Sequence, residues 1–263
     1  MGRSILVWRV AAVALLLGAV PSCGGNSNSD SGGGKASANE KSLFLVGVLD
    51  REPGACTATA DRGSTLLARG VLDLAFSSSY SAVVLVGNQF QSAASTASAP
   101  QTERVALSAA QVSLATASGR ALGMFMTAGT GFIDAAADSS AYGVMAVTIV
   151  PAALAQDTSL QGKEPLVATI EVEGQALDGT VMVSSELTFP IDVCTGCLVQ
   201  YPLSAADPTQ PAGASYRCTT FAADSGQTPA PPCVLGQDTA FSCVLCSASY
   251  EICRDPAQNP AYQ

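Results

Sequence analysis

The chain of 263 residues contains no histidine, and this absence removes several kinds of chemistry at once. Serine–histidine–aspartate and cysteine–histidine nucleophile systems, imidazole general bases and histidine-ligated metal sites all need the missing ring. Lysine is scarce as well, because Lys35, Lys41 and Lys163 are the only three. The sequence also lacks a GxSxG nucleophile motif, a phosphate-binding Gly-Lys-Ser/Thr loop and a GxGxxG turn. We therefore predict that the protein is not an enzyme.

Positive charge is the second shortage, with 12 Lys and Arg residues against 21 Asp and Glu residues and a net charge of −9. An acidic surface repels phosphate backbones and anionic lipid headgroups, so we expect no nucleic-acid partner. Tryptophan occurs once, as Trp8, near the N-terminus. If that segment is removed, the chain has no indole ring for the aromatic platform that sugar-binding modules commonly use.

The first 22 residues have the pattern of an export signal. Arg3 and Arg9 make the start positive, and the apolar run over residues 10–20 is shorter than a membrane span. The segment Val20-Pro21-Ser22-Cys23 resembles the bacterial lipobox, in which a peptidase cuts just before a cysteine that carries lipid. The resemblance implies a signal peptide over residues 1–22 and lipidation, including palmitate, at Cys23. An ordinary secretory signal with an incidental cysteine is the alternative.

Residues 23–41 follow the signal and are rich in Gly, Ser and Asn, with no large apolar side chain. Such a composition predicts a flexible tether between the lipid and a folded domain. Gly24, rather than aspartate, follows the cysteine, and by resemblance to sorting rules in two-membraned bacteria this implies the outer membrane. Acyl chains would hold the protein at that membrane, and the sequence leaves open which face it occupies.

Residues 42–193 contain short apolar or alternating runs separated by Ser, Gly and Asp, which is typical of β-strands. The clearest pair covers residues 166–173 and 180–187, which Asp178-Gly179 joins with a strong hairpin signal. Pro190 is predicted to end the domain, because proline does not fit a central ladder. The other predicted elements are strands over 43–49, 64–69, 71–76, 82–87, 104–116, 120–127 and 142–150, a loop over 129–141 and a short helix over 151–159.

This succession of short strands without a sustained helical period predicts an all-β fold. We expect an antiparallel β-sandwich with immunoglobulin- or fibronectin-like architecture over residues 42–193, followed by a small disulfide-rich tail over residues 194–263. The Cys…Trp…Cys pattern of true immunoglobulin domains is missing, so the analogy concerns architecture only.

Nine cysteines are present, and eight remain once Cys23 is set aside. An even set in an exported chain predicts disulfides, and a tail rich in proline needs cross-links because it cannot build a core unaided. We expect four disulfides, with Cys56 tying the tail to the β domain, and the sequence leaves the pairing open. The eight candidates are Cys56, Cys194, Cys197, Cys218, Cys233, Cys243, Cys246 and Cys253.

Two sharper interpretations of the cysteines compete with structural disulfides. Cys194, Cys197, Cys243 and Cys246 form two Cys-x-x-Cys motifs that could hold one zinc ion through four thiolates. Either motif could instead be a thioredoxin-like redox pair, although such pairs open a helix in a βαβ unit and the first motif here follows strands. Our main prediction therefore includes no metal and no cofactor.

Two pairs of carboxylates have some features of a site, but each pair has a simpler interpretation. Asp134 and Asp138 lie in a Gly- and Ser-rich loop and have the oxygen ligands that calcium prefers, but their spacing is not that of an EF-hand. Glu171 and Glu173 share one face of a predicted strand and could be compared with the acid pair of a glycosidase. That face is the polar one, so surface charge is the simpler interpretation.

The layout as a whole resembles uncharacterised envelope lipoproteins of large-genome Gram-negative bacteria. The resemblance rests on the lipobox, the tether, the run YSAVVLVGN at residues 80–88, CTGCL at 194–198 and PCVLGQD at 232–238. It implies no particular activity. We predict a lipid-anchored, non-enzymatic binding or structural module with an unidentified protein partner in the envelope. The alternative is a metal-binding or thiol-redox protein that uses the Cys-x-x-Cys pairs.

Overall fold

The computed structural model describes residues 43–52, 54–89, 104–134, 141–155, 164–201, 218, 230–254 and 256–262. The predicted signal, Cys23 and the tether lie outside the described residues, so lipidation and membrane attachment stay predictions. The β domain and the cysteine-rich tail belong to one compact unit. Within the described ranges, no helix is both long enough and apolar enough to cross a membrane.

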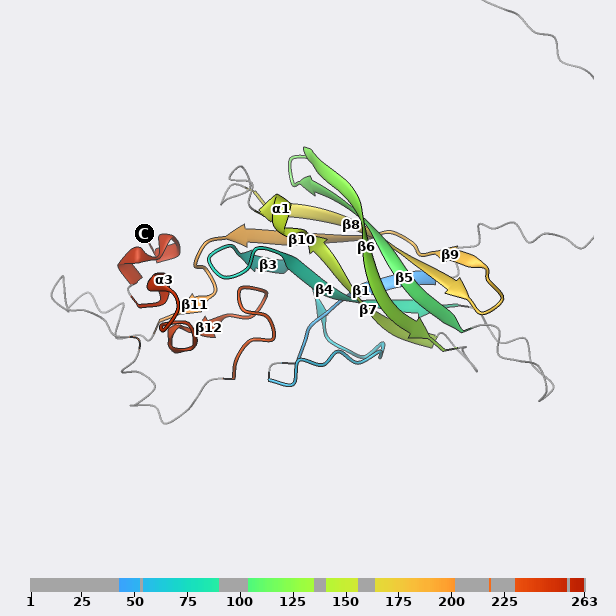
Figure 1. Ribbon diagram of the computed structural model, residues 1–263, viewed down its shortest axis with the longest axis horizontal. Coiled ribbons are helices and arrows are strands. Elements are labelled where there is room, and N and C mark those ends of the chain that lie inside the picture. Colours follow the sequence, from blue (N-terminus) through green and yellow to red (C-terminus); the bar gives the residue numbers. More distant parts are fainter. Residues whose placement is uncertain are drawn as a thin grey trace, which may run out of the picture. The chain divides into compact units, whose positions relative to one another are not determined.

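The first sheet is antiparallel, and its strands lie in the order β2-β1-β4-β7 (Figure 1). Its central strands are β1 (Leu43–Leu49), which matches the strand predicted over 43–49, and β4 (Tyr80–Asn88), which extends the strand predicted over 82–87 at both ends. β7 (Ala141–Val150) pairs with β4 over the whole of that strand. β2 (Leu66–Leu67) is a two-residue strand beside the end of β1.

The second sheet has the order β3-β10-β8-β5-β6, with β9 paired to β8 off this path. All its pairs are antiparallel except β3–β10, which is parallel. The predicted hairpin is present, since β8 turns at residues 177–180 and returns as β9. The strands are β3 (Gly70–Asp73), β5 (Val105–Thr116), β6 (Ala121–Ile133), β8 (Leu166–Ala176), β9 (Val181–Val183) and β10 (Leu187–Cys194).

One hydrophobic core is shared by the two sheets, because alternate residues of a strand point to the same face. The predicted alternation is clearest on β8, where Leu166 and Ile170 are at most 1% exposed. Glu171 and Glu173 alternate with these buried residues and lie on the outer face. Leu43 of β1 and Val84 of β4 enter the same core from the first sheet.

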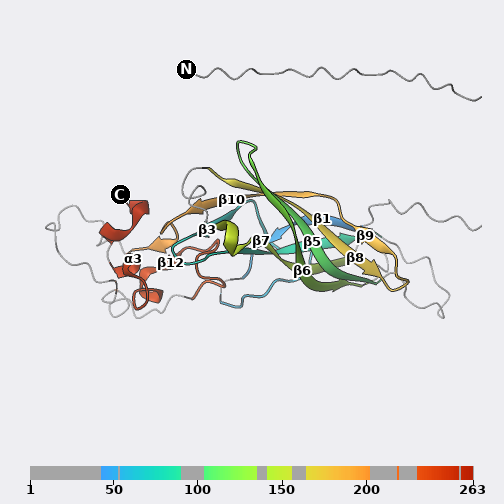
Figure 2. The same ribbon diagram turned by 45° about the horizontal axis from the view of Figure 1, so that its top comes forward.

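The two sheets come into backbone contact where β6 passes β7. A Cβ added at Gly131 of β6 would collide with the carbonyl oxygen of Val144, and one added at Gly143 of β7 would collide with that of Phe132. Only glycine allows so close an approach. Figure 2 shows that the long β5–β6 pair curls rather than lying flat. The all-β prediction is confirmed with curled sheets, and the finer immunoglobulin-like packing stays a prediction.

Two details of the predicted strands were wrong. The predicted loop over residues 129–141 begins too early, because β6 continues to Ile133. The glycines that suggested a turn there allow the close contact with β7 instead. Pro190 does not end the domain but lies inside β10. At Pro190 the only neighbouring strand is β8, since β3 pairs with β10 from Ile191 onward, so the missing N–H can face away from any ladder.

The tail packs against the end of the second sheet, which the sequence left open. A second hydrophobic cluster contains Phe241 and four of the tail cysteines, and Val71 and Phe76 from the β3 region pack against it; the four are Cys218, Cys243, Cys246 and Cys253. The Phe76 ring lies edge-on to Phe241 and Tyr250, with ring centroids 5.1 and 4.8 Å away. In the tail, β11 (Val199–Gln200) and β12 (Phe241–Ser242) pair in parallel as a small third sheet. The short helices are α1 (Ala152–Ala155), η3 (Cys243–Leu245), α3 (Glu251–Arg254), η4 (Pro256–Gln258) and η5 (Pro260–Tyr262).

The contact between β6 and β7 can be tested by adding a single methyl group. We expect Gly131→Ala to lower the free energy of unfolding by about 1–3 kcal/mol, because overpacking against a backbone carbonyl forces a strand to move. Gly123→Ala on the same strand is the matched control, since a Cβ there meets no atom within 4 Å. Urea denaturation measures both. An equal effect of the two substitutions would contradict the close approach.

Candidate functional site

All eight candidate cysteines form disulfides within the chain. The pairs are Cys56–Cys233, Cys194–Cys197, Cys218–Cys243 and Cys246–Cys253. Cys56 follows β1 and joins the tail, as predicted, across a sequence separation of 177 residues. The other three disulfides lie within the tail or at its first residues.

The structure does not join the two Cys-x-x-Cys motifs into one site. The sulfurs of Cys194 and Cys197 are bonded to each other, whereas Cys243 and Cys246 are bonded to Cys218 and Cys253. A sulfur in a disulfide is not the thiolate that zinc binds. In this oxidised form the four predicted zinc ligands are therefore divided among three disulfides.

Beside the Cys194–Cys197 disulfide lies a buried carboxylate that the sequence did not single out. Asp73, the last residue of β3, is 0% exposed, and its oxygen and the two sulfurs all lie within 4.8 Å of one another. Cys194 is half-buried and Cys197 is exposed. Among the described residues, Asp73, Cys194 and Cys197 are the one group of three Cys, Asp or Glu side chains close enough together to hold a metal ion.

Backbone N–H groups satisfy the Asp73 carboxylate. Its Oδ1 accepts hydrogen bonds from the backbone nitrogens of Gly196 at 2.6 Å and Ala75 at 3.0 Å. Its Oδ2 accepts from the backbone nitrogen of Leu198 at 3.0 Å. The Asp73 N–H in turn donates to the carbonyl oxygen of Gly236 at 2.9 Å. A buried charge is tolerated only with such partners, so Asp73 anchors two separate segments of the tail.

The other side of the loop is held by Asn259. Gly196 has a φ of 79°, a conformation that favours glycine, and a side chain at this position would collide with Asn259. The Asn259 side chain is buried and donates to the carbonyl oxygen of Gly196 at 2.8 Å. The loop between Cys194 and Cys197 is thus fixed by hydrogen bonds from two directions in addition to its disulfide.

The four disulfides differ widely in what they contribute to folding. In the chain-entropy model, the stabilisation grows with the length of the closed loop. Cys56–Cys233, with a separation of 177, would contribute about 5 kcal/mol, whereas Cys194–Cys197, with a separation of 3, would contribute about 2 kcal/mol. The disulfide nearest to Asp73 is therefore the one that folding needs least.

A second carboxylate, the half-buried Asp238, fastens the tail to β3 and β4. Its Oδ1 accepts from the Val71 N–H at 2.9 Å and from the Tyr80 hydroxyl at 2.8 Å, and its own N–H donates to the Val71 carbonyl oxygen at 3.0 Å. Tyr80 is 0% exposed. Asp238 has a φ of 57°, which aspartate adopts more readily than most residues. The hydrogen bonds offset the cost of that conformation.

Burial raises the pKa of the Asp238 carboxyl above its ordinary value, although hydrogen bonds from Val71 and Tyr80 and the charge of Arg51 act in the opposite direction. Burial also raises the pKa of the Tyr80 hydroxyl, and the nearby Asp238 carboxylate adds to this effect. Tyr80 therefore remains a neutral donor at physiological pH. The pair can act as a structural latch whose strength depends on the charge of Asp238.

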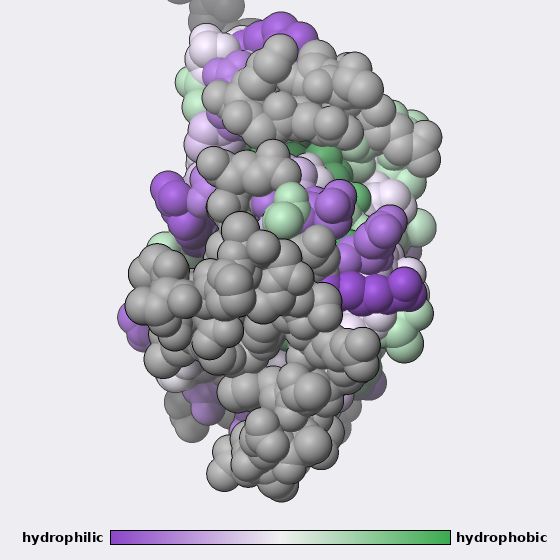
Figure 3. All heavy atoms as spheres, turned by 90° about the vertical axis from the view of Figure 1, so that its left-hand side faces the viewer, coloured by the Kyte–Doolittle hydropathy of each residue, from purple (hydrophilic) through white to green (hydrophobic). Residues whose placement is uncertain are grey.

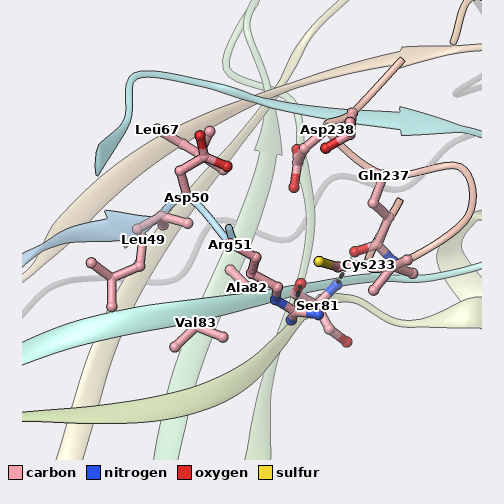
Figure 4. A pocket seen from close by; sticks show the side chains of 13 residues that line it. Leu49, Asp50, Arg51, Leu67, Ser81, Ala82, Val83, Cys233, Gln237 and Asp238 are labelled. Atoms are coloured by element: carbon pink, nitrogen blue, oxygen red, sulfur yellow. Dashed lines mark hydrogen bonds between the residues drawn. The ribbon is translucent and has the colours of Figure 1, made fainter. Parts of the chain in front are cut away.

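A small pocket lies beside this latch, between the segment after β1 and the tail. In Figure 4, Asp50 and Asp238 border the pocket from different segments, and the Arg51 side chain reaches toward Ser81. The Ser81 backbone is bound on both sides, because its N–H donates to Gln237 at 3.3 Å and its carbonyl oxygen accepts from Arg51 at 3.3 Å. The pocket volume of about 20 Å³ gives room for about one water molecule.

The carboxylate pairs considered in the sequence do not form part of the Asp73 or Asp238 sites in the described residues. Glu171 and Glu173 are half-buried on the outer face of β8, opposite Gln111 and Ala109 of β5. Asp134 forms an ion pair with Arg104, with 3.0 Å between its Oδ1 and the Arg104 Nε, and Asp138 lies outside the described residues. Glu171, Glu173 and Asp134 are the three of these four carboxylates that the structure describes, and the hydrogen bonds of Asp73 and Asp238 given above join other residues.

The outer face of the second sheet carries exposed apolar side chains on two flanking strands. We call these residues the outer patch: Met124, Met126 and Phe132 of β6, and Val181 and Val183 of β9, which are 65%, 53%, 56%, 62% and 39% exposed. Through the β5 and β8 ladders, Glu171 and Glu173 lie between the two flanks. By contrast, the coloured surface in Figure 3, at the tail end, carries mainly hydrophilic side chains.

Sequence reasoning missed Asp73, Asp238 and Tyr80. A signal for Asp73 existed, because it interrupts a predicted buried strand, and a buried carboxylate must have dedicated donors. Asp238 and Tyr80 lie 158 residues apart, and nothing in either local sequence indicates the other. The tertiary contact alone brings them together.

No protein-family model and no curated protein matches the chain. Among solved structures, the chain is similar to one described as "X-ray structure of Northeast Structural Genomics Consortium target SoR45", at 13% identity over 45% of this chain and 78% of that chain. The TM-score of 0.26 is too low to support an argument about fold or function.

The latch predicts a pH-dependent effect of Tyr80→Phe. Because burial raises the folded-state pKa of Asp238, the stability that this group supplies is complete at acid pH and is lost as the pH rises through that pKa. The Tyr80 hydroxyl limits the loss by donating to the ionised carboxylate. We therefore expect Tyr80→Phe to cost about 1.5–3 kcal/mol of unfolding free energy near neutral pH and clearly less at about pH 3.

Denaturant unfolding at the two pH values measures this difference. Tyr142→Phe is the matched control, because Tyr142 is a half-buried tyrosine whose ring packs edge-on against Phe44. An equal destabilisation by Tyr80→Phe at both pH values would contradict a charge-dependent latch.

Proposed function

We propose that this protein is a lipid-anchored lipoprotein of the outer membrane whose β-rich domain acts as a non-enzymatic binding or structural module. The lipobox ending in Cys23 and the tether over residues 23–41 support the anchor. A flexible tether of that length has a root-mean-square span of about 25 Å. That distance would keep the domain close to the membrane while letting it turn toward a partner.

The outer patch is the observation that carries the binding role. Groups of large exposed apolar side chains on a folded surface often mark contact sites, whereas single exposed apolar residues need no explanation. Met124 and Met126 are adaptable apolar side chains of the kind that contact surfaces use. Phe132 is flanked by Arg104, whose guanidinium carbon lies 4.2 Å from the ring centroid. An immunoglobulin- or fibronectin-like β-sandwich would present such a face as a rigid platform.

The occupant that we propose for the outer patch is a protein of the envelope. Glu171 and Glu173 lie between the apolar flanks, so the partner surface should place Lys or Arg side chains there and apolar side chains on both sides. An anionic membrane surface is disfavoured, because it would face those two carboxylates. The alternative function, metal binding or thiol exchange, draws support only from the Cys194–Cys197 loop.

The anchor predicts where the protein is found after cell fractionation. We expect the wild-type chain in the membrane fraction and the Cys23→Ser variant, which cannot be lipidated, in the soluble fraction of the envelope. Ser29→Ala, a substitution in the tether that leaves Cys23 and all the disulfides in place, is the control. Retention of Cys23→Ser in the membrane fraction, together with an unchanged mass for the wild-type N-terminus, would contradict the lipoprotein assignment.

The binding role predicts a crosslink that depends on the outer patch. A photo-crosslinking amino acid at Met126 of the full-length protein in cells should give an adduct of one defined mass. Phe132→Glu together with Val183→Glu should weaken the adduct by about tenfold, because burying a new carboxylate in an apolar contact is costly. Ala60→Glu, an exposed position outside the patch, is the control. An adduct that the Phe132→Glu, Val183→Glu double variant does not weaken would contradict the role of the patch.

A further inference from the structure

We propose that the Cys194–Cys197 disulfide is an exchangeable redox bond that takes two electrons from a dithiol partner, whereas the other three disulfides are structural. This goes beyond the binding role and does not depend on it. Exposure separates the bond from the two buried disulfides of the tail, and loop length separates it from Cys56–Cys233.

Exposure gives the bond a direction of attack. Cys197 is exposed, and its partner Cys194 is half-buried. A thiolate from outside can therefore reach the Cys197 sulfur more easily than the Cys194 sulfur. Cys246 and Cys253 are at most 2% exposed, and Cys218 and Cys243 at most 1%, so neither of those disulfides offers a comparable approach.

Exposure alone does not single out the bond, because Cys56 is also exposed and its partner Cys233 is half-buried. The two disulfides differ instead in what opening them releases. Opening Cys194–Cys197 releases a loop with a sequence separation of 3 residues, whereas opening Cys56–Cys233 releases one with a separation of 177. In the chain-entropy model the long closure supplies the larger share of the folding stability, so opening Cys56–Cys233 loosens the fold more than opening Cys194–Cys197 does. Cys56–Cys233 is therefore a matched internal control.

The loop keeps its shape when the bond opens. Asp73 accepts hydrogen bonds from the Gly196 and Leu198 N–H groups, and Asn259 donates to the Gly196 carbonyl oxygen. None of these bonds involves sulfur, so the two thiols would stay within reach of each other. The Asp73 carboxylate lies within 4.8 Å of both sulfurs, so the group that holds the loop is directly beside the exchangeable bond.

A thiolate of the partner dithiol attacks the Cys197 sulfur, the sulfur–sulfur bond breaks, and Cys194 leaves with the electron pair and takes up a proton. The second partner thiol, as a thiolate, attacks the partner sulfur of the mixed disulfide, and Cys197 leaves and takes up a proton. The partner becomes a disulfide, having lost two electrons and two protons, and both cysteines end as thiols.

Stepwise reduction of the full mature chain tests the proposal. Dithiothreitol is the probe, at increasing concentration, followed by alkylation and peptide mass mapping. We expect Cys194 and Cys197 to be alkylated at concentrations about tenfold below those that open Cys56–Cys233, with the folded far-ultraviolet dichroism retained. Opening of both disulfides together, or loss of the fold with the first of them, would overturn the proposal.

Two single variants test the direction of attack. Cys194→Ser leaves the exposed Cys197 thiol, and Cys197→Ser leaves the half-buried Cys194 thiol. With oxidised glutathione as the probe, we expect Cys194→Ser to form the mixed disulfide about tenfold faster. Equal rates would overturn the assignment of Cys197 as the attacked sulfur. Isolation of the wild-type chain with these two thiols free and one zinc ion bound would replace the redox role with a metal site of Asp73, Cys194 and Cys197.

Discussion

The carboxylate of Asp73 accepts backbone N–H groups from Ala75, Gly196 and Leu198, and the rest of the tail is arranged around that contact. It joins the end of β3 to the segment that leaves β10, while the Asp73 N–H holds Gly236 from the far part of the tail. Because the group is fully buried, losing any of these donors would leave a charge without compensation. A fixed tail is therefore a condition for burying Asp73.

Asp238 completes the junction from the other side. Its bonds to Val71 and Tyr80 place the tail against β3 and β4, and Gln237 beside it donates to the Ser79 carbonyl oxygen at 2.7 Å. The disulfides add to a junction that hydrogen bonds already define. This division explains how one disulfide can be available for exchange while the loop that carries it stays in place.

The sequence predicted the sheet elements well where a local pattern decides them. The alternation on β8 and the Asp178-Gly179 turn are examples, because side-chain period and turn conformation are local properties. The prediction failed at Gly131 and Pro190, because the structural role of each depends on which strand lies beside it. Of the candidate site, the cysteines and their even number were predictable, but the choice of partners and the buried carboxylates were not.

By itself the sequence determined that the chain is β-rich, acidic, without histidine and stapled by eight cysteines. Composition and short-range periodicity carry that information, because they need no contact between distant residues. Only the tertiary structure decided that the sheets curl together at β6 and β7, that the outer patch lies on both sides of two carboxylates, and that Asp73 lies beside the Cys194–Cys197 bond. Each of these depends on residues far apart in sequence, whose proximity is set by packing and hydrogen bonding of the whole fold.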